Sequence, residues 1–467
     1  MVREVLMDFK KAVKLLAVVA SVLIAYFLAS PLEEKMRVTL TLLVFASGLW
    51  ITELLPMGIT GLIIAVAQPL LGAQTFEKAL TPFFSPTVAL ILGSFFLALA
   101  FEKQDLDEAL AYRLVMRIGG DAKKLVLGLM FTTAFLSMWL SNTATAALMV
   151  TLALGLTVKC EKEKDRENFY KVAVLGIAYS ASVGGIATLI GTPPNMVAAG
   201  MLQELVGYNL TFLGWMLYGL PITAIFVLLI LVLLFRLFPV EATIVQKPEK
   251  KTAVLNVKQK LTLFVFILAA ALWVTSSLPE PLAATFGWRG HGLPSGLVAL
   301  LVTIVLFLMG VLNQHDIPRV DWNTVLLFGG GLSLGAAMEA SGLTDWVGQS
   351  LAVAVGRGSS AILFLVLGFS ALLFTMVASN TASANVFVPI AISVSLAIGI
   401  SPVVSAVLVA VCSSLDFMLP VGTPPNAIAY STGKVKVREM VKAGLLLDIV
   451  GALVTIIFAL TFWPLIS

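Results

Sequence analysis

The chain has 467 residues, of which 59% are hydrophobic and only 12% are charged. Ordinary soluble domains contain about 45–50% apolar and about 25% charged residues, so a soluble globular fold is excluded. The net charge of +4 does not indicate nucleic-acid binding, because the basic residues lie in short segments between apolar runs, as in cytosolic loops of membrane proteins. With 2 Cys and 2 His, the chain has little material for redox or zinc chemistry.

Several runs of the chain are long enough to cross a membrane. Val172–Gln203, Leu205–Phe235 and Gly358–Leu415 contain no charged residue, and about 20 residues of helix span a bilayer. The basic start and apolar stretch of Met1–Ser30 could form a secretory signal. An uncleaved first helix is the better interpretation in a chain that continues to span. We predict an all-α polytopic membrane protein with about eleven transmembrane helices, two re-entrant helical hairpins and two broken helices.

Basic residues predict which ends of the spans are cytosolic. The run 125–158 has Lys and Arg residues before and after it, so both of its ends are predicted to be cytosolic. A segment of this length must then be a re-entrant hairpin, with its tip at Ser141–Thr143. The run 358–400 has little flanking charge and is interpreted as a hairpin that enters from outside. This topology places the N-terminus in the cytosol and the C-terminus outside.

Two motifs occur twice in the same order. Ser-Asn-Thr-Ala at 141–144 recurs at 379–382, and Gly-Thr-Pro-Pro-Asn at 191–195 recurs at 422–426. We interpret this as a duplication whose two units have opposite orientation, the architecture of secondary transporters with a site at the midplane. The predicted domains are an N-terminal span at 1–37, a first inverted repeat at 38–238 with its hairpin at 125–158 and broken helix at 171–200, a cytosolic linker at 239–260, and a second inverted repeat at 261–467 with its hairpin at 358–400 and broken helix at 403–430.

The two motifs have a chemistry suited to ions. The prolines of Gly-Thr-Pro-Pro-Asn lack N–H donors, so the helix must break, and Thr192 or Thr423 can cap the second half-helix. The break offers free carbonyls to a cation and free N–H groups to an anion. Ser-Asn-Thr adds hydroxyl and amide groups that bind carboxylates or metal ions. Interhelical hydrogen bonding and a simple kink are the structural alternatives, but the repetition of both motifs favours a binding site.

The doubled motif set resembles the divalent anion/sodium symporter family, which includes dicarboxylate and citrate carriers. The resemblance covers nearly the whole chain. It implies a homodimer in the lipid bilayer, in which each protomer has a scaffold domain and a transport domain that moves as an elevator. It also implies C4-dicarboxylates, citrate or related anions as substrates, usually with sodium as the coupling ion and without a cofactor.

By position, the resemblance implies two sodium sites and a substrate site between them. The first sodium site would contain Ser137, Asn142 and the Gly191 carbonyl. The second would contain Thr375, Asn380 and the Gly422 carbonyl. The substrate carboxylates would contact a set of polar residues and one proline: Ser141, Asn142, Thr143, Ser379, Asn380, Thr381, Thr423 and Pro424.

One acidic residue stands outside the motif set. Asp416 lies seven residues before Thr423, about two helical turns away, and its partner in the first repeat is the neutral Gly185. A lone acid amid neutral ligands is costly without a cation. We therefore expect Asp416 to supply negative charge to a neighbouring sodium ion. The alternatives are a proton carrier, which burial would hold protonated, and an acid that points at water or a neighbouring hydroxyl and has neither role.

The sequence thus predicts a transporter of a prokaryotic inner membrane. The leading interpretation is sodium-coupled import of small di- or tricarboxylates. The alternatives are a sodium-independent anion exchanger and a carrier of another divalent oxyanion such as sulfate. A membrane-embedded enzyme is disfavoured because few titratable groups lie within the spans. An ion channel is disfavoured because the repeats favour alternating access over a symmetric filter.

Overall fold

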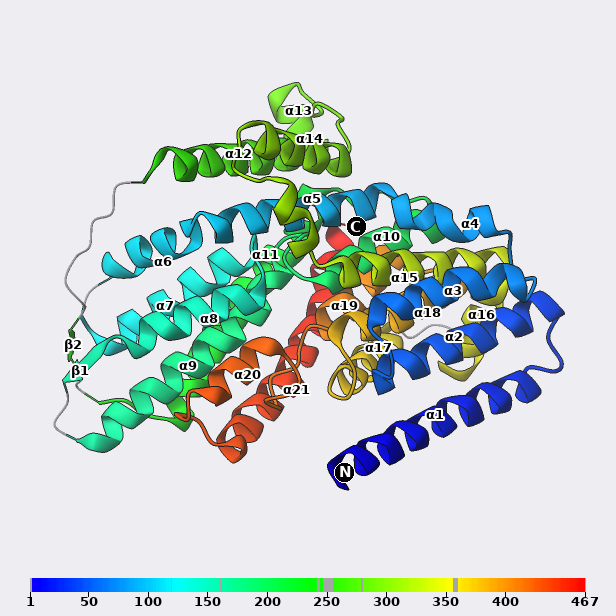
Figure 1. The fold of residues 1–467 in the computed structure, drawn as a ribbon, viewed down its shortest axis with the longest axis horizontal. Helices are drawn as coiled ribbons and strands as arrows, with labels where there is room; N and C mark the ends of the chain where they lie inside the picture. The colour runs from blue at the N-terminus through cyan, green and yellow to red at the C-terminus, as the bar shows by residue number, and fades with distance from the viewer. Residues whose placement is uncertain are drawn as a thin grey trace.

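The fold is described by a computed structural model that covers residues 2–118, 120–159, 162–241, 244–246, 255–278, 280–355 and 360–466. Cys160, Arg357 and residues 242–243 and 247–254 of the predicted linker lie outside the described residues. Nearly every described element is a helix (Figure 1). Within the described ranges, 8 helices are long and apolar enough to cross a membrane. This confirms the prediction of an all-α polytopic membrane protein.

The first half of the chain contains the predicted hairpin and broken helix. The hairpin is formed by α7 and α8, and the broken helix by α9 and α10. The elements in chain order are α1 (Val2–Leu28), α2 (Glu34–Thr52), α3 (Met57–Leu70), α4 (Phe76–Leu80), η1 (Thr81–Phe84), α5 (Pro86–Lys103), α6 (Leu106–Met116), α7 (Ala122–Ser137), α8 (Asn142–Leu154), β1 (Thr157–Lys159), α9 (Glu163–Ile186), α10 (Pro193–Val206) and α11 (Phe212–Leu237).

The second half repeats this order of elements. Its hairpin is formed by α17 and α18, and its broken helix by α19 and α20. The elements are β2 (Ile244–Gln246), α12 (Val257–Val274), α13 (Glu280–Phe286), α14 (Ser295–Leu308), η2 (Gln314–Arg319), α15 (Trp322–Ala340), α16 (Leu343–Val355), α17 (Ser360–Thr375), α18 (Asn380–Ile398), α19 (Pro402–Cys412), α20 (Pro424–Ser431), α21 (Val437–Thr461) and η3 (Trp463–Leu465).

A short antiparallel ladder was not predicted from the sequence. Strand β1 follows α8 and pairs with β2, with Val158 opposite Val245. The ladder therefore ties the end of the first hairpin to the segment between the two halves. Three residues on each side are too few to change the helical class of the fold.

Helix α9 is enclosed by its neighbours, whereas α1 lies at the edge of the molecule. In the apolar segment of α9, 89% of the residues are buried, against 6% in α1. Figure 1 shows α1 on one side of the body and α12 to α14 on the other. The two hairpins and the two broken helices lie between these edges, so the motif residues reach the interior.

Several helices outside the motifs pack closely against one another where a glycine leaves room for the neighbouring helix. A side chain on Gly61 of α3 would overlap the Leu326 carbonyl of α15, and one on Gly93 of α5 would overlap the main chain of Ala299 in α14. Helix α15 also contacts the second hairpin, because a side chain on Gly331 would overlap the Asn385 side chain of α18. Helix α15 therefore lies between the α3 side of the molecule and the motif-bearing helices.

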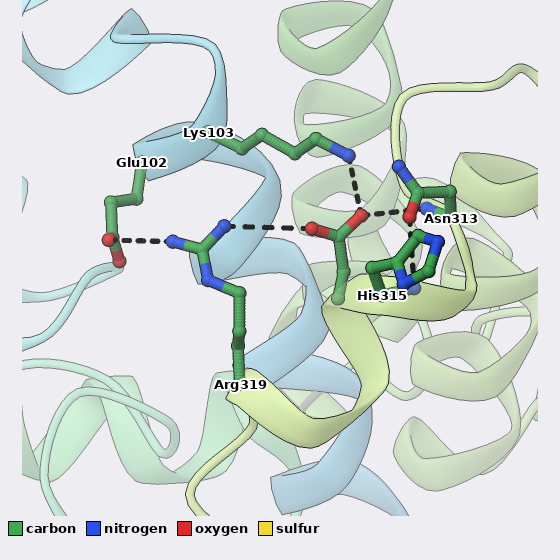
Figure 2. Close-up of polar contacts among 6 residues, drawn as sticks. Glu102, Lys103, Asn313, His315 and Arg319 are labelled. Atoms are coloured by element: carbon green, nitrogen blue, oxygen red, sulfur yellow. Dashed lines mark hydrogen bonds and ion pairs between the residues drawn. The ribbon is translucent and has the colours of Figure 1, made fainter.

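An ionic cluster joins the end of α5 to η2 (Figure 2). The Lys103 Nζ lies 2.5 Å from Asp316 Oδ2, and the Asn313 amide donates to the same oxygen at 2.7 Å. Arg319 lies between Asp316 and Glu102, with N–O distances of 3.6 and 3.1 Å. Asp316 is buried, so its partners are needed to compensate its lost hydration.

Candidate functional site

The two hairpins break at corresponding positions, although Ser141 makes no side-chain cap on the helix that follows it. Helix α7 ends at Ser137 and α8 begins at Asn142, while α17 ends at Thr375 and α18 begins at Asn380. The four residues between each pair of helices are not helical. The Ser379 hydroxyl accepts a hydrogen bond from the Ala382 amide at 3.2 Å and so caps α18. In both hairpins the non-helical residues lie next to the Ser-Asn-Thr motif.

The two broken helices open around the prolines, as predicted. Helix α9 ends at Ile186 and α10 begins at Pro193, while α19 ends at Cys412 and α20 begins at Pro424. The Thr423 hydroxyl accepts a hydrogen bond from the main-chain N–H of Asn426 at 3.4 Å. Thr192 makes no side-chain cap, so the predicted capping role holds only for Thr423.

The last residue of each Gly-Thr-Pro-Pro-Asn motif holds the break together. The Asn195 side-chain amide donates to the carbonyls of Gly185 and Thr188, at 2.9 and 2.7 Å. The Asn426 side-chain amide donates to the main-chain carbonyls of Asp416 and Leu419, both at 3.0 Å. These bonds satisfy carbonyls that the break removes from the helical pattern. Sequence reasoning assigned no role to either asparagine, although both belong to the repeated motif.

A cavity of about 360 Å³ lies where the hairpin tips and helix breaks meet. It brings together all eight residues predicted to bind substrate and both of the predicted sodium-binding glycines. The lining residues from the motifs are Ser141, Asn142, Thr143, Gly191, Thr192, Pro193, Ser379, Asn380, Thr381, Gly422, Thr423, Pro424 and Pro425. Ser137 and Thr375 do not line the cavity but lie buried behind it.

The electrostatics of this cavity come mainly from helix ends. Four helices begin at residues that line it: Asn142 of α8, Pro193 of α10, Asn380 of α18 and Pro424 of α20. Each helix start carries a partial positive charge, and α8 and α18 also offer main-chain N–H groups, whereas the first two residues of α10 and α20 are prolines, which have none. The described lining residues include one charged side chain, Asp321, and no Lys or Arg. The cavity therefore suits an anion bound by dipoles and hydroxyls.

The first predicted sodium site is a cluster of oxygen atoms. The Ser137 hydroxyl oxygen lies 2.6 Å from Asn142 Oδ1 and 2.7 Å from the Ala181 carbonyl oxygen. A side chain on Gly185 would meet Asn142 Oδ1 at 2.8 Å and the Gly191 carbonyl oxygen at 2.9 Å, so both oxygens border one small space. The hydroxyl has a single hydrogen to donate. The excess of acceptors fits a bound cation.

The second predicted sodium site repeats this arrangement. The Thr375 hydroxyl oxygen lies 2.8 Å from Asn380 Oδ1 and 2.8 Å from the Ser413 carbonyl oxygen. Thr375 is buried, with 1% of its surface exposed. Again three oxygen atoms share one hydroxyl hydrogen, and the donor set fits a small hard cation.

Four polar residues of the cavity come from outside the motifs and were not predicted: Ser182 of α9 and three that come from α5 and the start of α15. Ser94 lies in α5, and Asp321 and Thr324 lie at the start of α15. The Asp321 carboxylate accepts the Thr324 amide hydrogen at 3.1 Å and caps α15. None of the three belongs to the repeated motifs, so only the packing of α5 and α15 against the hairpins places them here.

The helical fold, the paired hairpins and this cavity define a membrane transporter. Residues 9–467 match the sodium:sulfate symporter transmembrane region. The chain therefore belongs to this family, the divalent anion/sodium symporters, as the motifs predicted. It is 37% identical over 436 residues to an uncharacterized transporter of Haemophilus influenzae, covering 93% of each chain. It is 30% identical to the sodium-dependent dicarboxylate transporter SdcS of Staphylococcus saprophyticus, covering 91% of this chain and 86% of SdcS.

Two solved structures share the fold at low sequence identity. The YdaH transporter of Alcanivorax borkumensis matches with a TM-score of 0.59 at 16% identity, over 84% of this chain and 89% of YdaH. MtrF of Neisseria gonorrhoeae, described as an antimetabolite efflux pump, matches with a TM-score of 0.56 at 13% identity, over 85% of this chain and 84% of MtrF. These likenesses concern the fold alone.

Proposed function

We propose that this protein imports small dicarboxylates together with sodium ions. The observation that carries the proposal is that four helix starts and two oxygen clusters meet at one cavity that has no Lys or Arg among its described lining residues. A dicarboxylate has two negative charges, and the helix dipoles offset only part of them. Two bound sodium ions would complete the charge balance, so anion and cations favour each other's binding.

The relatives support the choice of substrate. SdcS is named as a sodium-dependent dicarboxylate transporter, and the two hairpin tips offer hydroxyl and amide groups that suit anionic oxygen atoms at both ends of a short molecule. Sulfate is the second candidate, because the family is described by sodium:sulfate symport and the same groups would bind its oxygens. Tricarboxylates such as citrate are a larger variant of the first substrate class.

The position of the cavity supports alternating access from the cytosolic side. Asp321 and Thr324 begin α15 directly after η2, where Arg319 and the neighbouring Lys103 form ion pairs with Glu102 and Asp316. The topology proposed from the basic segments of the sequence puts this end of α15 on the cytosolic side, and the proposal therefore has the cavity facing inward. The proposed topology therefore has a cytosolic N-terminus and an external C-terminus in a prokaryotic inner membrane.

The proposed motion is an elevator movement of the hairpins and broken helices past α15. Small residues lie at these contacts: Gly331 of α15 faces Asn385 of α18, Gly335 of α15 faces Met201 of α10, and Leu332 of α15 lies against Gly200 of α10. Such a surface lets one group of helices slide against another. The proposal includes a homodimer in which the remaining helices are the stationary scaffold, as the family resemblance implies.

The test is uptake of labelled succinate into proteoliposomes containing the full-length protein. An inward sodium gradient is expected to drive accumulation, and an equal potassium gradient is not. Unlabelled sulfate and citrate are added as competitors to rank the substrate classes. Equal uptake in sodium and potassium would reject sodium coupling, and uptake of sulfate in place of succinate would favour the second candidate.

A further inference from the structure

Asp416 and Gly185 occupy the same place in the two halves of the molecule. The main-chain carbonyl of Gly185 accepts a hydrogen bond from the Asn195 side chain. The main-chain carbonyl of Asp416 accepts one from the Asn426 side chain. The two asparagines end the same motif in each half. The halves therefore differ at this point by a side chain, which is absent in the first and a carboxylate in the second.

The Asp416 side chain lies next to the second predicted sodium site. In the first half, a Cβ on Gly185 would lie 2.8 Å from Asn142 Oδ1 and 2.9 Å from the Gly191 carbonyl oxygen. In the second half, a Cβ on Gly422 would overlap both carboxylate oxygens of Asp416. The Asp416 carboxylate thus packs against the main chain of Gly422, whose carbonyl belongs to the second site.

The Asp416 carboxylate is buried without a partner. Its residue is 0% exposed, and neither carboxylate oxygen has a hydrogen-bond partner among the described residues. A buried ionised carboxylate without donors is strongly disfavoured. The neighbouring carboxylate differs in this respect, because Asp448 Oδ1 accepts from the Phe417 amide at 3.0 Å. Asp448 is therefore bonded to the main chain through one oxygen and has no partner at the other among the described residues, whereas Asp416 has no partner at either oxygen.

We infer that Asp416 supplies a carboxylate ligand to the cation of the second site, so that the two sodium sites differ by one formal negative charge. The inference rests on the proposed function, because it assigns a ligand to one of its sodium sites. A charged ligand strengthens cation binding in a water-poor environment. The second site then fills at lower sodium concentration than the first and fills without substrate.

The experiment measures binding of radioactive sodium to the purified full-length protein in nanodiscs without substrate, with choline keeping the ionic strength constant. Wild type is expected to show a tight and a weak phase. Asp416→Asn and Asp416→Gly, the latter restoring the residue of the first half, are expected to raise the half-saturating sodium concentration of the tight phase by about tenfold or more. Gly422→Ala, which pushes on the carboxylate, is expected to act in the same direction.

Two control variants separate the sites. Ser137→Ala is expected to weaken only the weak phase, and Asp448→Asn is expected to leave the tight phase within about threefold of wild type. Size-exclusion profiles identify variants that fail to fold. Sodium affinity is measured independently in Asp416→Asn, Asp416→Gly, Gly422→Ala and Asp448→Asn, so the failure of one variant to fold leaves the others to test the inference. Tight binding that is unchanged in Asp416→Asn and Asp416→Gly, or lost only in Asp448→Asn, would overturn the inference.

The same preparations distinguish this inference from the proposed function. Sodium-driven succinate uptake in wild type, combined with sodium binding that does not depend on Asp416, would refute the inference and leave the function standing. Sodium binding that depends on Asp416, combined with succinate uptake that is indifferent to sodium, would support the ligand and refute the proposed coupling.

Discussion

The Thr375 hydroxyl oxygen lies 2.8 Å from the side-chain oxygen of Asn380, and Ser137 stands in the same relation to Asn142 at 2.6 Å. In each hairpin the hydroxyl residue ends one helix and the asparagine begins the next. Four non-helical residues between them turn the asparagine back onto the hydroxyl. The same chain geometry thus builds one oxygen cluster in each half of the molecule.

The first prediction concerns these asparagines. Asn142→Ala and Asn380→Ala are each expected to abolish succinate uptake, because each amide borders both an oxygen cluster and the cavity. Loss of one neutral hydrogen bond costs only about 0.5–1.5 kcal/mol, but the change here removes a ligand from the cation and the anion together. Uptake by proteoliposomes checks it, and more than half of wild-type uptake in either variant would reject the site.

A matched control separates loss of the site from loss of stability. Asn256 caps α12, where its side chain accepts from the Gln259 amide at 2.8 Å. Asn256→Ala removes a cap worth about 0.5–2 kcal/mol without touching the cavity. It is expected to lower the unfolding temperature and to leave the half-saturating succinate and sodium concentrations unchanged.

The second prediction concerns the bonds that hold the helix breaks. Asn195→Ala and Asn426→Ala each leave two buried carbonyls without their side-chain donor. Each unsatisfied group costs about 1–3 kcal/mol, so both variants are expected to unfold at lower temperature than wild type. Thermal unfolding in detergent measures this, and an unchanged unfolding temperature would show that water replaces these bonds.

The third prediction concerns movement of the hairpins past α15. Cysteines replacing Gly331 and Asn385, in a background with the native cysteines changed to alanine, are expected to form a disulfide that arrests uptake until it is reduced. Sodium with succinate is expected to change the rate of cross-linking. The control pair replaces Gly93 and Ala299, which pack within the proposed scaffold, and should respond to neither ligand. Equal rates for the first pair with and without ligands would contradict the elevator.

The fourth prediction concerns the stability of the ionic cluster in acid. Burial opposes ionisation of Asp316, but hydrogen bonds from Lys103 and the Asn313 amide, together with the nearby Arg319, hold its pKa below the usual value. A lowered pKa in the folded state stabilises the protein above the ordinary aspartate pKa of about 3.9, and this stabilisation is lost as the pH falls through the folded-state value.

Asp316→Asn removes this contribution at every pH. The variant is expected to unfold more easily than wild type at pH 7, by about 1.5–3 kcal/mol, the range for a hydrogen bond to a charged group. The difference between the two proteins should shrink below about pH 4, where wild type also loses the charge. Unfolding temperatures measured from pH 7 to pH 3 check this, and a difference that is constant with pH would contradict it.

The sequence predicted the motif-bearing part of the fold well, because repetition and charge distribution are properties of the chain itself. The prolines at 193 and 424 begin their half-helices as expected, and the two Ser-Asn-Thr tips reach one cavity. The contributions of Ser94 and Asp321 to the cavity depend on how α5 and α15 pack against the hairpins. That packing is set by glycine contacts far apart in the sequence, which no local pattern reveals.

The central claim is that a dicarboxylate and sodium bind together in one cavity, and calorimetric titration of succinate into purified protein tests it most directly. Because coupling is reciprocal, sodium must raise succinate affinity by the same factor by which succinate raises sodium affinity. We predict that replacing potassium by sodium strengthens succinate binding by about tenfold or more. Equal succinate affinity in the two salts would contradict the account.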